Sequence, residues 1–208
     1  MKMKVLLLNG SPHEKGCTFT ALSEVAGALE RSGLETEILW LGKGETIGCR
    51  GCGACAKLGK CVFDDVVNAA ADKAKECDGL VIGSPVHYAS ASGQITCALD
   101  RLFYSAGKHL RFKPAAAVVS ARRAGTTAAI DQLNKYFSIN QMPVVSSRYW
   151  NMVHGSSPDE VLQDEEGVAV MRTLGNNMAW LLKSIQAGRE AGVALPEPEP
   201  PARTNFIR

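Results

Sequence analysis

Residues 5–18 read VLLLNGSPHEKGCT, and this stretch is the strongest indication of how the chain folds. The four apolar residues at its start are continuous, which is typical of a parallel strand that is buried on both faces. The loop behind them contains two glycines for tight turns, with Ser11 and Thr18 as hydroxyl donors. Residues 18–31 then carry apolar side chains at helical spacing. The stretch therefore predicts a strand, a loop and a helix, with loop amides and a positive dipole end that converge on an anion such as a phosphate.

Two familiar phosphate-binding loops differ from this one. A nucleoside-triphosphate loop has four residues between its glycines and then Lys followed by Ser or Thr. Here five residues separate Gly10 from Gly16, and Cys17 stands where the Lys belongs. The dinucleotide fingerprint G-x-G-x-x-G follows none of the strand candidates. The candidate that remains is the loop that holds the monophosphate of FMN in flavodoxin-like folds, and the alternative is an ordinary strand-to-helix turn that binds no ligand.

Composition narrows the classes of protein to consider. The chain has 208 residues, of which 46% are hydrophobic and 21% are charged, with a formal net charge of +2. These values match neither a disordered chain nor a strongly basic nucleic-acid-binding protein. No apolar run reaches membrane-spanning length, no signal-peptide pattern opens the sequence, and the odd number of cysteines does not fit a secreted disulfide framework. We therefore expect a cytoplasmic protein that binds neither nucleic acid nor a membrane.

Apolar runs and amphipathic stretches alternate along the chain. The strand candidates are residues 5–8, 35–41, 79–82, 115–119 and 142–149. The helix candidates are residues 18–31, 65–76, 92–104, 127–137 and 165–186. Parallel strands need crossover helices, and these cover both faces of the sheet. The alternation therefore predicts an α/β fold with a doubly wound, five-stranded parallel sheet of the flavodoxin-like order 2-1-3-4-5.

The end of the chain differs from the rest in composition. Residues 195–201 read LPEPEPP, and a segment so rich in proline forms neither a helix nor a central strand. We assign residues 1–195 to one flavodoxin-like FMN-binding domain. Residues 196–208 are assigned to a Pro-rich C-terminal tail, which we expect to be extended and able to lie on a neighbouring subunit.

Ligands of such a sheet bind beyond the carboxyl ends of its strands, so the loops at that edge are candidate contacts. Residues 83–93, GSPVHYASASG, follow the third strand candidate, and residues 120–127, SARRAGTT, follow the fourth. Both loops are dense in small residues, with an aromatic or a cationic side chain among them. Such loops suit a flat ring system, which needs close backbone approach along its edge and an apolar surface against its face. Either loop alone is equally compatible with a plain connection.

Seven cysteines form a second strong signal, because four of them fall within thirteen residues. They follow the spacing C-x2-C-x2-C-x5-C, at Cys49, Cys52, Cys55 and Cys61. This run is compact enough for four thiolates to meet at one metal centre, and the glycines between them let the backbone wrap tightly. Structural zinc sites more often use two separated knuckles. The spacing leaves a cluster, zinc or unmetallated thiols open.

Three motifs in the first hundred or so residues carry a family resemblance. They are LNGSP at residues 8–12 with Gly16 and Thr18, GSPVHY at 83–88 running to LDR at 99–101, and CRGCGAC at 49–55 through CVFDD at 61–65. Together they resemble the flavodoxin-like NAD(P)H-dependent FMN reductases, and more narrowly the iron-sulfur flavoproteins within that group. The part of the chain after Thr127 matches only in its alternation of strands and helices.

The resemblance implies three groups of cofactor contacts. The FMN phosphate would be surrounded by Ser11, His13, Gly16, Cys17 and Thr18. The isoalloxazine would lie beside Pro85, Val86, His87 and Tyr88. Its other edge would be covered by Ser120, Ala121, Arg122, Arg123 and Gly125. Relatives usually have Asn at the position of Cys17, so here backbone amides and Thr18 would hold the phosphate.

The resemblance also implies a [4Fe-4S] cluster on Cys49, Cys52, Cys55 and Cys61. It further implies that Asp100 and Arg101 lie at a subunit interface of a homodimer or homotetramer. The alternative for those two residues is a helix-surface pair of little energetic weight.

The implied function is that of an FMN-dependent oxidoreductase with NAD(P)H as co-substrate. Hydride would pass to the flavin, and electrons would leave to a small acceptor, a carrier protein or the cluster. The flavin supplies this chemistry, so no catalytic side chain is expected. The alternative is an iron-sulfur flavoprotein that carries electrons without oxidising NAD(P)H. The near-neutral charge argues mildly against a pure carrier, because docking of redox partners relies on a one-signed surface.

Overall fold

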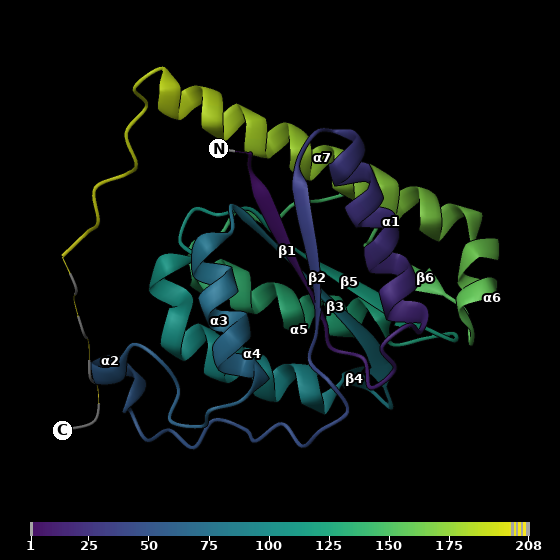
Figure 1. The fold of residues 1–208 in the computed structure, drawn as a ribbon, viewed down its shortest axis with the longest axis horizontal. Coiled ribbons are helices and arrows are strands. Elements are labelled where there is room, and N and C mark those ends of the chain that lie inside the picture. The colour runs from purple at the N-terminus through teal and green to yellow at the C-terminus, as the bar shows by residue number, and fades with distance from the viewer. Residues whose placement is uncertain (1, 201, 203, 205, 207–208) are drawn as a thin grey trace.

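The structure, a computed structural model, describes residues 2–200, 202, 204 and 206. Five parallel strands form its sheet, in the order β2-β1-β3-β5-β6 (Figure 1). They are β1 (Lys4–Asn9), β2 (Glu35–Trp40), β3 (Gly79–His87), β5 (Ala115–Ala121) and β6 (Met152–His154). A two-residue strand, β4 (Ser90–Ala91), pairs antiparallel with the end of β3.

Helices cover both faces of the sheet (Figure 1). One face carries α1 (Cys17–Arg31), α6 (Pro158–Gln163) and α7 (Glu165–Glu190). The other carries α3 (Val66–Glu76), α4 (Gly93–Ala106) and α5 (Thr126–Ile139). The short helix α2 (Cys55–Leu58) lies within the run of cysteines, and a 3-10 turn (Gly107–His109) follows α4.

The sheet separates two apolar cores, because successive side chains of a strand point to opposite faces. In β1, Leu6 and Leu8 pack in the core on the side of α3, α4 and α5, whereas Val5 and Leu7 pack in the core on the side of α1 and α7. All four side chains are at most 1% exposed. A strand buried on both faces has no polar side to show, which explains the continuous apolar run of β1.

These elements confirm the predicted fold class. Without the small β4, the parallel strands follow the order 2-1-3-4-5 in chain sequence. The helix expected at residues 18–31 begins one residue earlier, at Cys17, and the last helix runs four residues longer than expected, to Glu190.

The fifth strand was predicted in the wrong place. Residues 142–149 form only an isolated bridge, between Val144 and Ala115, and β6 comes later. Pro143 has no amide hydrogen for a ladder, so this segment touches β5 only at its amino end. The chain then leaves the sheet and returns at Met152, which pairs with Val119. The periodic pattern of residues 142–149 therefore marks packing against the core and not a strand.

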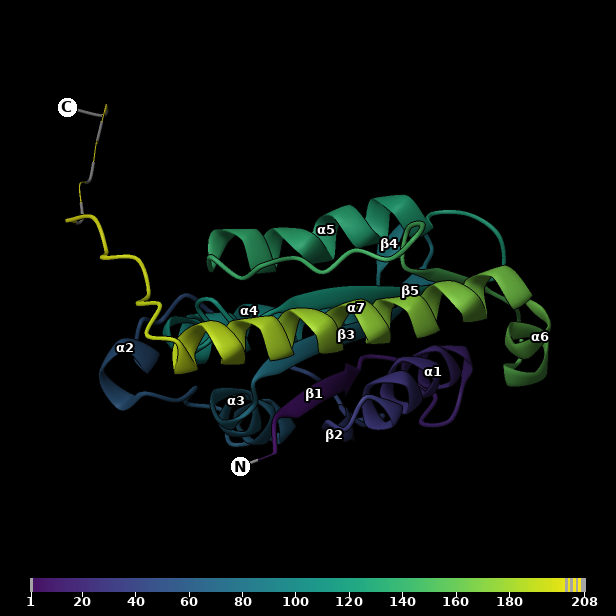
Figure 2. The same ribbon diagram turned by 90° about the horizontal axis from the view of Figure 1, so that it is seen from above.

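The segment after α7 leaves the helical layer, as Figure 2 shows. Residues 193–200 are exposed and lie in neither a helix nor a strand. The division into a domain at 1–195 and a tail at 196–208 stays a prediction, and residues 201, 203, 205, 207 and 208 of that tail lie outside the described residues. Among the helices that the structure describes, none combines the length and the apolar character needed to cross a bilayer.

Candidate functional site

The loops that follow β1, β3 and β5 meet at the carboxyl edge of the sheet. Ser92, at the start of α4, donates its hydroxyl to the carbonyl oxygen of Gly10 over 2.8 Å. The amide of Ser92 donates to the hydroxyl of Ser84, in β3, over 2.9 Å. Thr18, in the first turn of α1, and Ser120, at the end of β5, share a hydrogen bond of 2.8 Å between their hydroxyls. These buried contacts tie the three loops into one rigid cradle.

The carboxamide of Asn9 shapes the first of these loops. Asn9 is fully buried, and its Nδ2 donates to the carbonyl oxygen of Glu14 over 2.9 Å. Its Oδ1 accepts from the amide of Ser11, whose hydroxyl in turn accepts from the amide of His13. Trp40, at the end of β2, donates its indole N–H to the carbonyl oxygen of Ser11 over 2.8 Å. The loop is therefore held from inside and from its neighbour strand, so its remaining amides have fixed directions.

Helix α1 begins at this loop with no side-chain cap. The first amides of a helix have no partner within the helix, and its dipole places positive potential there. A Cβ at Gly16 would lie 2.9 Å from the Cβ of His13, so a larger residue would push this turn apart. Burial raises the pKa of the Cys17 thiol, which is therefore uncharged at neutral pH and adds no negative charge. An uncapped helix start with a neutral thiol suits a bound anion.

An open hollow extends from the start of α1. Its lining includes His13, Lys15, Gly16, Cys17, Trp40 and Lys43, together with residues 156–158. Lys15 and Lys43 contribute two positive charges to this lining, and Glu14 contributes one carboxylate. Free amides, hydroxyls and an excess of positive charge form the donor set that the phosphate of FMN requires, so the residues present fit this group.

The loops after β3 and β5 approach each other closely beside this cradle. Gly125 has φ +88°, and a Cβ on it would lie 2.9 Å from Cγ1 of Val86. Pro85 and Val86 are half-buried, whereas His87 and Tyr88 are exposed. Tyr88 has φ +58°, a left-handed conformation that is uncommon outside glycine. The backbone thus forms a narrow edge with one exposed aromatic ring beside it.

The end of β5 contributes small buried residues and two exposed cations. Ser120 is 3% exposed and Ala121 is 8% exposed. The next two residues, Arg122 and Arg123, are exposed. The structure therefore places all fourteen predicted FMN contacts at one edge of the sheet, on three loops that touch. Their contact with FMN stays a prediction.

The four cysteines of the run line one cavity of about 150 Å³, more than the 10–15 Å³ that one water needs. Its wall contains Cys49, Cys52, Cys55 and Cys61, together with Phe63, Arg101 and Tyr104. Within the described residues, no three Cys, His, Asp or Glu side chains are placed to hold one metal ion. In a cluster, each thiolate binds a different iron, so its ligands lie farther apart than those of a single ion. Four thiols around one cavity are the ligand type of a cluster, and the cluster itself stays a prediction.

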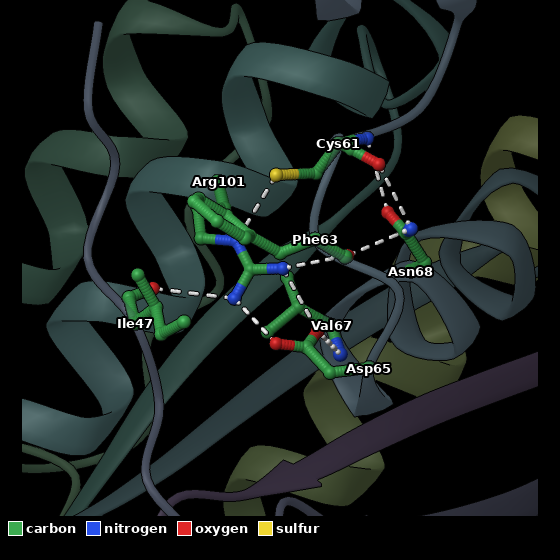
Figure 3. A network of polar contacts seen from close by, with 7 residues as sticks. All are labelled: Ile47, Cys61, Phe63, Asp65, Val67, Asn68 and Arg101. Atoms are coloured by element: carbon green, nitrogen blue, oxygen red, sulfur yellow. Dashed lines mark hydrogen bonds and ion pairs between the residues drawn. The ribbon is translucent and has the colours of Figure 1, made fainter.

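Arg101 belongs to the wall of this cavity, and its side chain is entirely buried. Figure 3 shows its polar contacts. Its Nη1 and Nη2 bind the two carboxylate oxygens of Asp65 over 2.7 and 2.8 Å. The same nitrogens donate to the carbonyl oxygens of Ile47 and Phe63. Its Nε donates to Sγ of Cys61 over 3.2 Å. One residue of α4 thus fixes the segments before, within and after the run of cysteines.

Burial disfavours the charged forms of both Asp65 and Arg101, but their mutual hydrogen bonds outweigh it. The pKa of Asp65 consequently lies below its ordinary value and that of Arg101 above it. Asp65 also accepts from the amide of Val67 and so caps α3. The pair remains ionised over the whole neutral range.

The expectation of a subunit interface at Asp100 and Arg101 is corrected for Arg101. That side chain is buried against Asp65 within its own chain, so it is neither an interface residue nor a weak surface pair. Asp100 accepts a hydrogen bond from the hydroxyl of Tyr136 over 2.6 Å. Neighbouring residues on α4 point to different faces, which separates the two side chains.

Helix α4 connects the two sites. Its cap, Ser92, binds the loop after β1, and Arg101 binds the cysteine run. The two residues are nine positions apart, which corresponds to about 13.5 Å along a helix. In Figures 1 and 2, α2 lies at the left edge of the molecule and β4 lies well to its right. The cradle and the cysteine cavity are therefore separate sites on one rigid element.

Several residues that build these sites were given no role from the sequence, although Asn9, Asp65 and Ser92 lie in stretches that it singled out. They are Asn9, Trp40, Asp65, Asn68 and Ser92. A polar residue at the end of an apolar strand, as at Asn9, is a signal that could have been used. For Ser92 the partner is 82 positions away, and no local pattern indicates it.

A parallel sheet of this order, with its loops meeting at the carboxyl ends of the strands, is the flavodoxin-like architecture. The sequence profile of the family described as NADPH-dependent FMN reductase matches residues 3–157. An iron-sulfur flavoprotein of Methanocaldococcus jannaschii is 34% identical over 192 residues, which cover 88% of this chain and 100% of that protein. An iron-sulfur flavoprotein of Methanosarcina thermophila is 25% identical over 193 residues, which cover 90% and 100%. The chain therefore belongs to the NADPH-dependent FMN reductase family, in its iron-sulfur flavoprotein subgroup.

Solved structures agree on the fold. RosB with a bound flavin intermediate superposes with a TM-score of 0.70 at 17% identity, covering 99% of this chain and 92% of that one. An archaeal flavodoxin superposes with a TM-score of 0.59 at 14% identity, covering 88% and 99%. With the family established, the chain is an FMN-dependent oxidoreductase of flavodoxin-like fold.

Proposed function

We propose that this oxidoreductase accepts hydride from NAD(P)H and passes electrons to a small acceptor, a carrier protein or a [4Fe-4S] cluster bound by the run of cysteines. FMN, when bound, supplies the hydride and electron chemistry. The observation that carries the proposal is the pair of sites that α4 holds at a fixed separation, one suited to a flavin phosphate and one lined by four thiols.

The chain's part in this function is to bind and to orient. The amides at the start of α1 and the loop held by Asn9 would bind the phosphate. The close approach of Val86 and Gly125 would place backbone groups along the ring. Arg122 and Arg123 are exposed at the same edge, where a guanidinium can bind a phosphate of the nicotinamide nucleotide. Hydride transfer needs no further acid or base from the protein.

The cysteine cavity supports a cluster as the second redox centre. Its four thiols are the ligand type that iron-sulfur clusters require. The named relatives are iron-sulfur flavoproteins. Protein purified without air should contain iron and acid-labile sulfide in addition to flavin, and the absence of both would refute the cluster.

Rapid mixing of the FMN-loaded protein with NADH or NADPH, without air, tests hydride acceptance. We expect the flavin absorbance to bleach with at least one of the two nucleotides. Replacement of Arg122 or Arg123 by Gln should raise the nucleotide concentration needed for half-maximal rate. Arg111→Gln is the control, because Arg111 is exposed, precedes β5 and donates its hydrogen bonds to Gln141. An oxidised spectrum that persists with both nucleotides would refute NAD(P)H oxidation and favour the second candidate, an electron carrier reduced by another protein.

We also propose that the protein assembles as a homodimer or homotetramer. Tyr104 is 74% and Ile139 is 82% exposed, and together with Phe103 and Tyr136 they line one hollow on the outside of α4 and α5. Apolar side chains grouped in this way are typical of protein contacts. Light scattering on the purified protein would show a mass of two or four chains, and a monomer would contradict the proposal.

A further inference from the structure

The guanidinium of Arg101 has a partner for every one of its N–H directions, and one partner is a sulfur atom (Figure 3). Asp65 takes both ends of the fork, so most of the positive charge is already compensated. The Nε–H is left to point at Sγ of Cys61. A buried guanidinium in this setting cannot turn away, because any other orientation would break several hydrogen bonds at once.

This bond makes the four cysteines unequal. Cys49 and Cys52 are exposed, and the Sγ of Cys49 accepts from a backbone amide, that of Gly51, over 3.5 Å. Cys61 is half-buried, and its backbone is held on both sides by Asn68, which accepts from its amide and donates to its carbonyl oxygen over 3.0 Å each. Among the thiols of the run that the structure describes, Cys61 is the one bound by a charged side chain.

We propose that Arg101 is a positioning residue for the metal centre: its Nε–H fixes the Cys61 sulfur at the cavity and raises the reduction potential of the cluster bound there. The inference rests on the proposed function, because it needs that cluster. Hydrogen bonds to ligand sulfurs and the local net charge both set cluster potentials. Reduction adds negative charge that spreads onto the sulfur ligands, so a donor on sulfur stabilises the reduced form more than the oxidised form.

Arg50 provides a matched comparison within the same cavity. Its guanidinium lies 5.0 Å from the centre of the Phe63 ring, and that of Arg101 lies 5.2 Å from the same ring. Arg50 is exposed and lines the cavity. It makes no hydrogen bond to a cysteine sulfur among the contacts within the described part of the chain. Loss of Arg50 therefore removes a nearby charge without removing an N–H···S bond.

The test is a reductive titration of the cluster in the full-length protein, purified without air, with iron and sulfide assayed beforehand. Arg101→Gln should shift the one-electron equilibrium toward the oxidised cluster by at least tenfold. The reduction potential of the cluster would then be about 59 mV more negative than in wild type. Arg101→Lys keeps a cation against Asp65 and so preserves the fold, but it lacks the Nε–H, and its shift should have the same sign. Arg50→Gln should stay within about twofold of wild type, since exposed charges are screened.

Equal potentials in wild type and in both loaded Arg101 variants would overturn the inference while leaving the cluster in place. Wild-type protein with neither iron nor sulfide would instead refute the proposed cluster, and the inference with it. A role of Arg101 in stability alone would lower the unfolding temperature of the variants without moving the potential, and that result also counts against the inference.

Discussion

The hydroxyl of Ser92 donates a hydrogen bond to the carbonyl oxygen of Gly10 across 2.8 Å. The hydroxyl oxygen of Ser92 in turn accepts from the amide of Ile95 and thereby caps α4. Ile95 also lies so close to Gly10 that a Cβ there would come within 2.6 Å of its own Cβ. One serine thus joins the phosphate loop to the helix that reaches the cysteine cavity.

Ser92→Ala should destabilise the protein by about 1–2 kcal/mol, because it removes a helix cap and a buried hydrogen bond. FMN should also bind more weakly, since the loop at Gly10 loses its tether. Urea unfolding and FMN titration measure the two effects. Ser90→Ala is the control, because its hydroxyl donates to the neighbouring carbonyl oxygen of Ala91. Equal stability and affinity in the two variants would contradict the role given to Ser92.

Gly125→Ala should weaken FMN binding more than it affects the rest of the fold. A left-handed backbone costs a residue with a Cβ about 1–2 kcal/mol, and the new methyl group would meet Val86 at 2.9 Å. The loops after β3 and β5 must then separate. Gly93→Ala serves as control, because no atom of the described residues outside its own neighbourhood lies within 4 Å of its added Cβ and alanine favours a helix. Should both variants bind FMN as tightly as wild type, this pair of loops would not form the ring edge.

We predict that the stability of the fold depends on pH through Glu37, a residue of β2. Hydrogen bonds from Lys4 and Lys73 hold the pKa of Glu37 below its ordinary value. The stabilisation is therefore present above the unfolded-state pKa of about 4.3 and is lost as the pH falls through the folded-state pKa. At pH 7, Glu37→Gln should cost about 0.5–1 kcal/mol, as is usual for partly exposed pairs.

Urea unfolding of wild type and Glu37→Gln at pH 7 and at pH 3 measures this difference. The gap between the two proteins should close at the lower pH, and FMN affinity at pH 7 should not change. Glu45→Gln is the control, since Glu45 is exposed and has no ion pair among the described residues. A gap of equal size at both pH values would show that the carboxylate is not the source of the stabilisation.

Sequence patterns predict a strand correctly where it is buried on both faces, as in β1. They predict the end of a strand less well where a neighbouring strand stops partway along it. β3 continues to His87, past Pro85, although GSP resembles a turn. Beyond Gly83 it no longer pairs with β1, so the missing amide hydrogen of Pro85 faces an open side. Such tolerance depends on the neighbouring strand and is invisible in local patterns.

The sites, too, were only partly predictable from local sequence patterns. Motif spacing placed three loops at one edge, because carboxyl ends of parallel strands always share an edge. The bonds that lock them join residues far apart in the chain, as between Thr18 and Ser120. Likewise, the spacing of the cysteines was evident, but the bond from Arg101 to Cys61 depends on how α4 packs. Long-range side-chain geometry is set by the whole fold and not by a motif.

Titration of flavin-free protein with FMN, followed by flavin fluorescence, tests the central claim that the strand edge binds this cofactor. The cradle predicts saturation at one FMN per chain, with weaker binding in Gly125→Ala than in Gly93→Ala. Fluorescence equal to that of free FMN at every point of the titration would contradict the account.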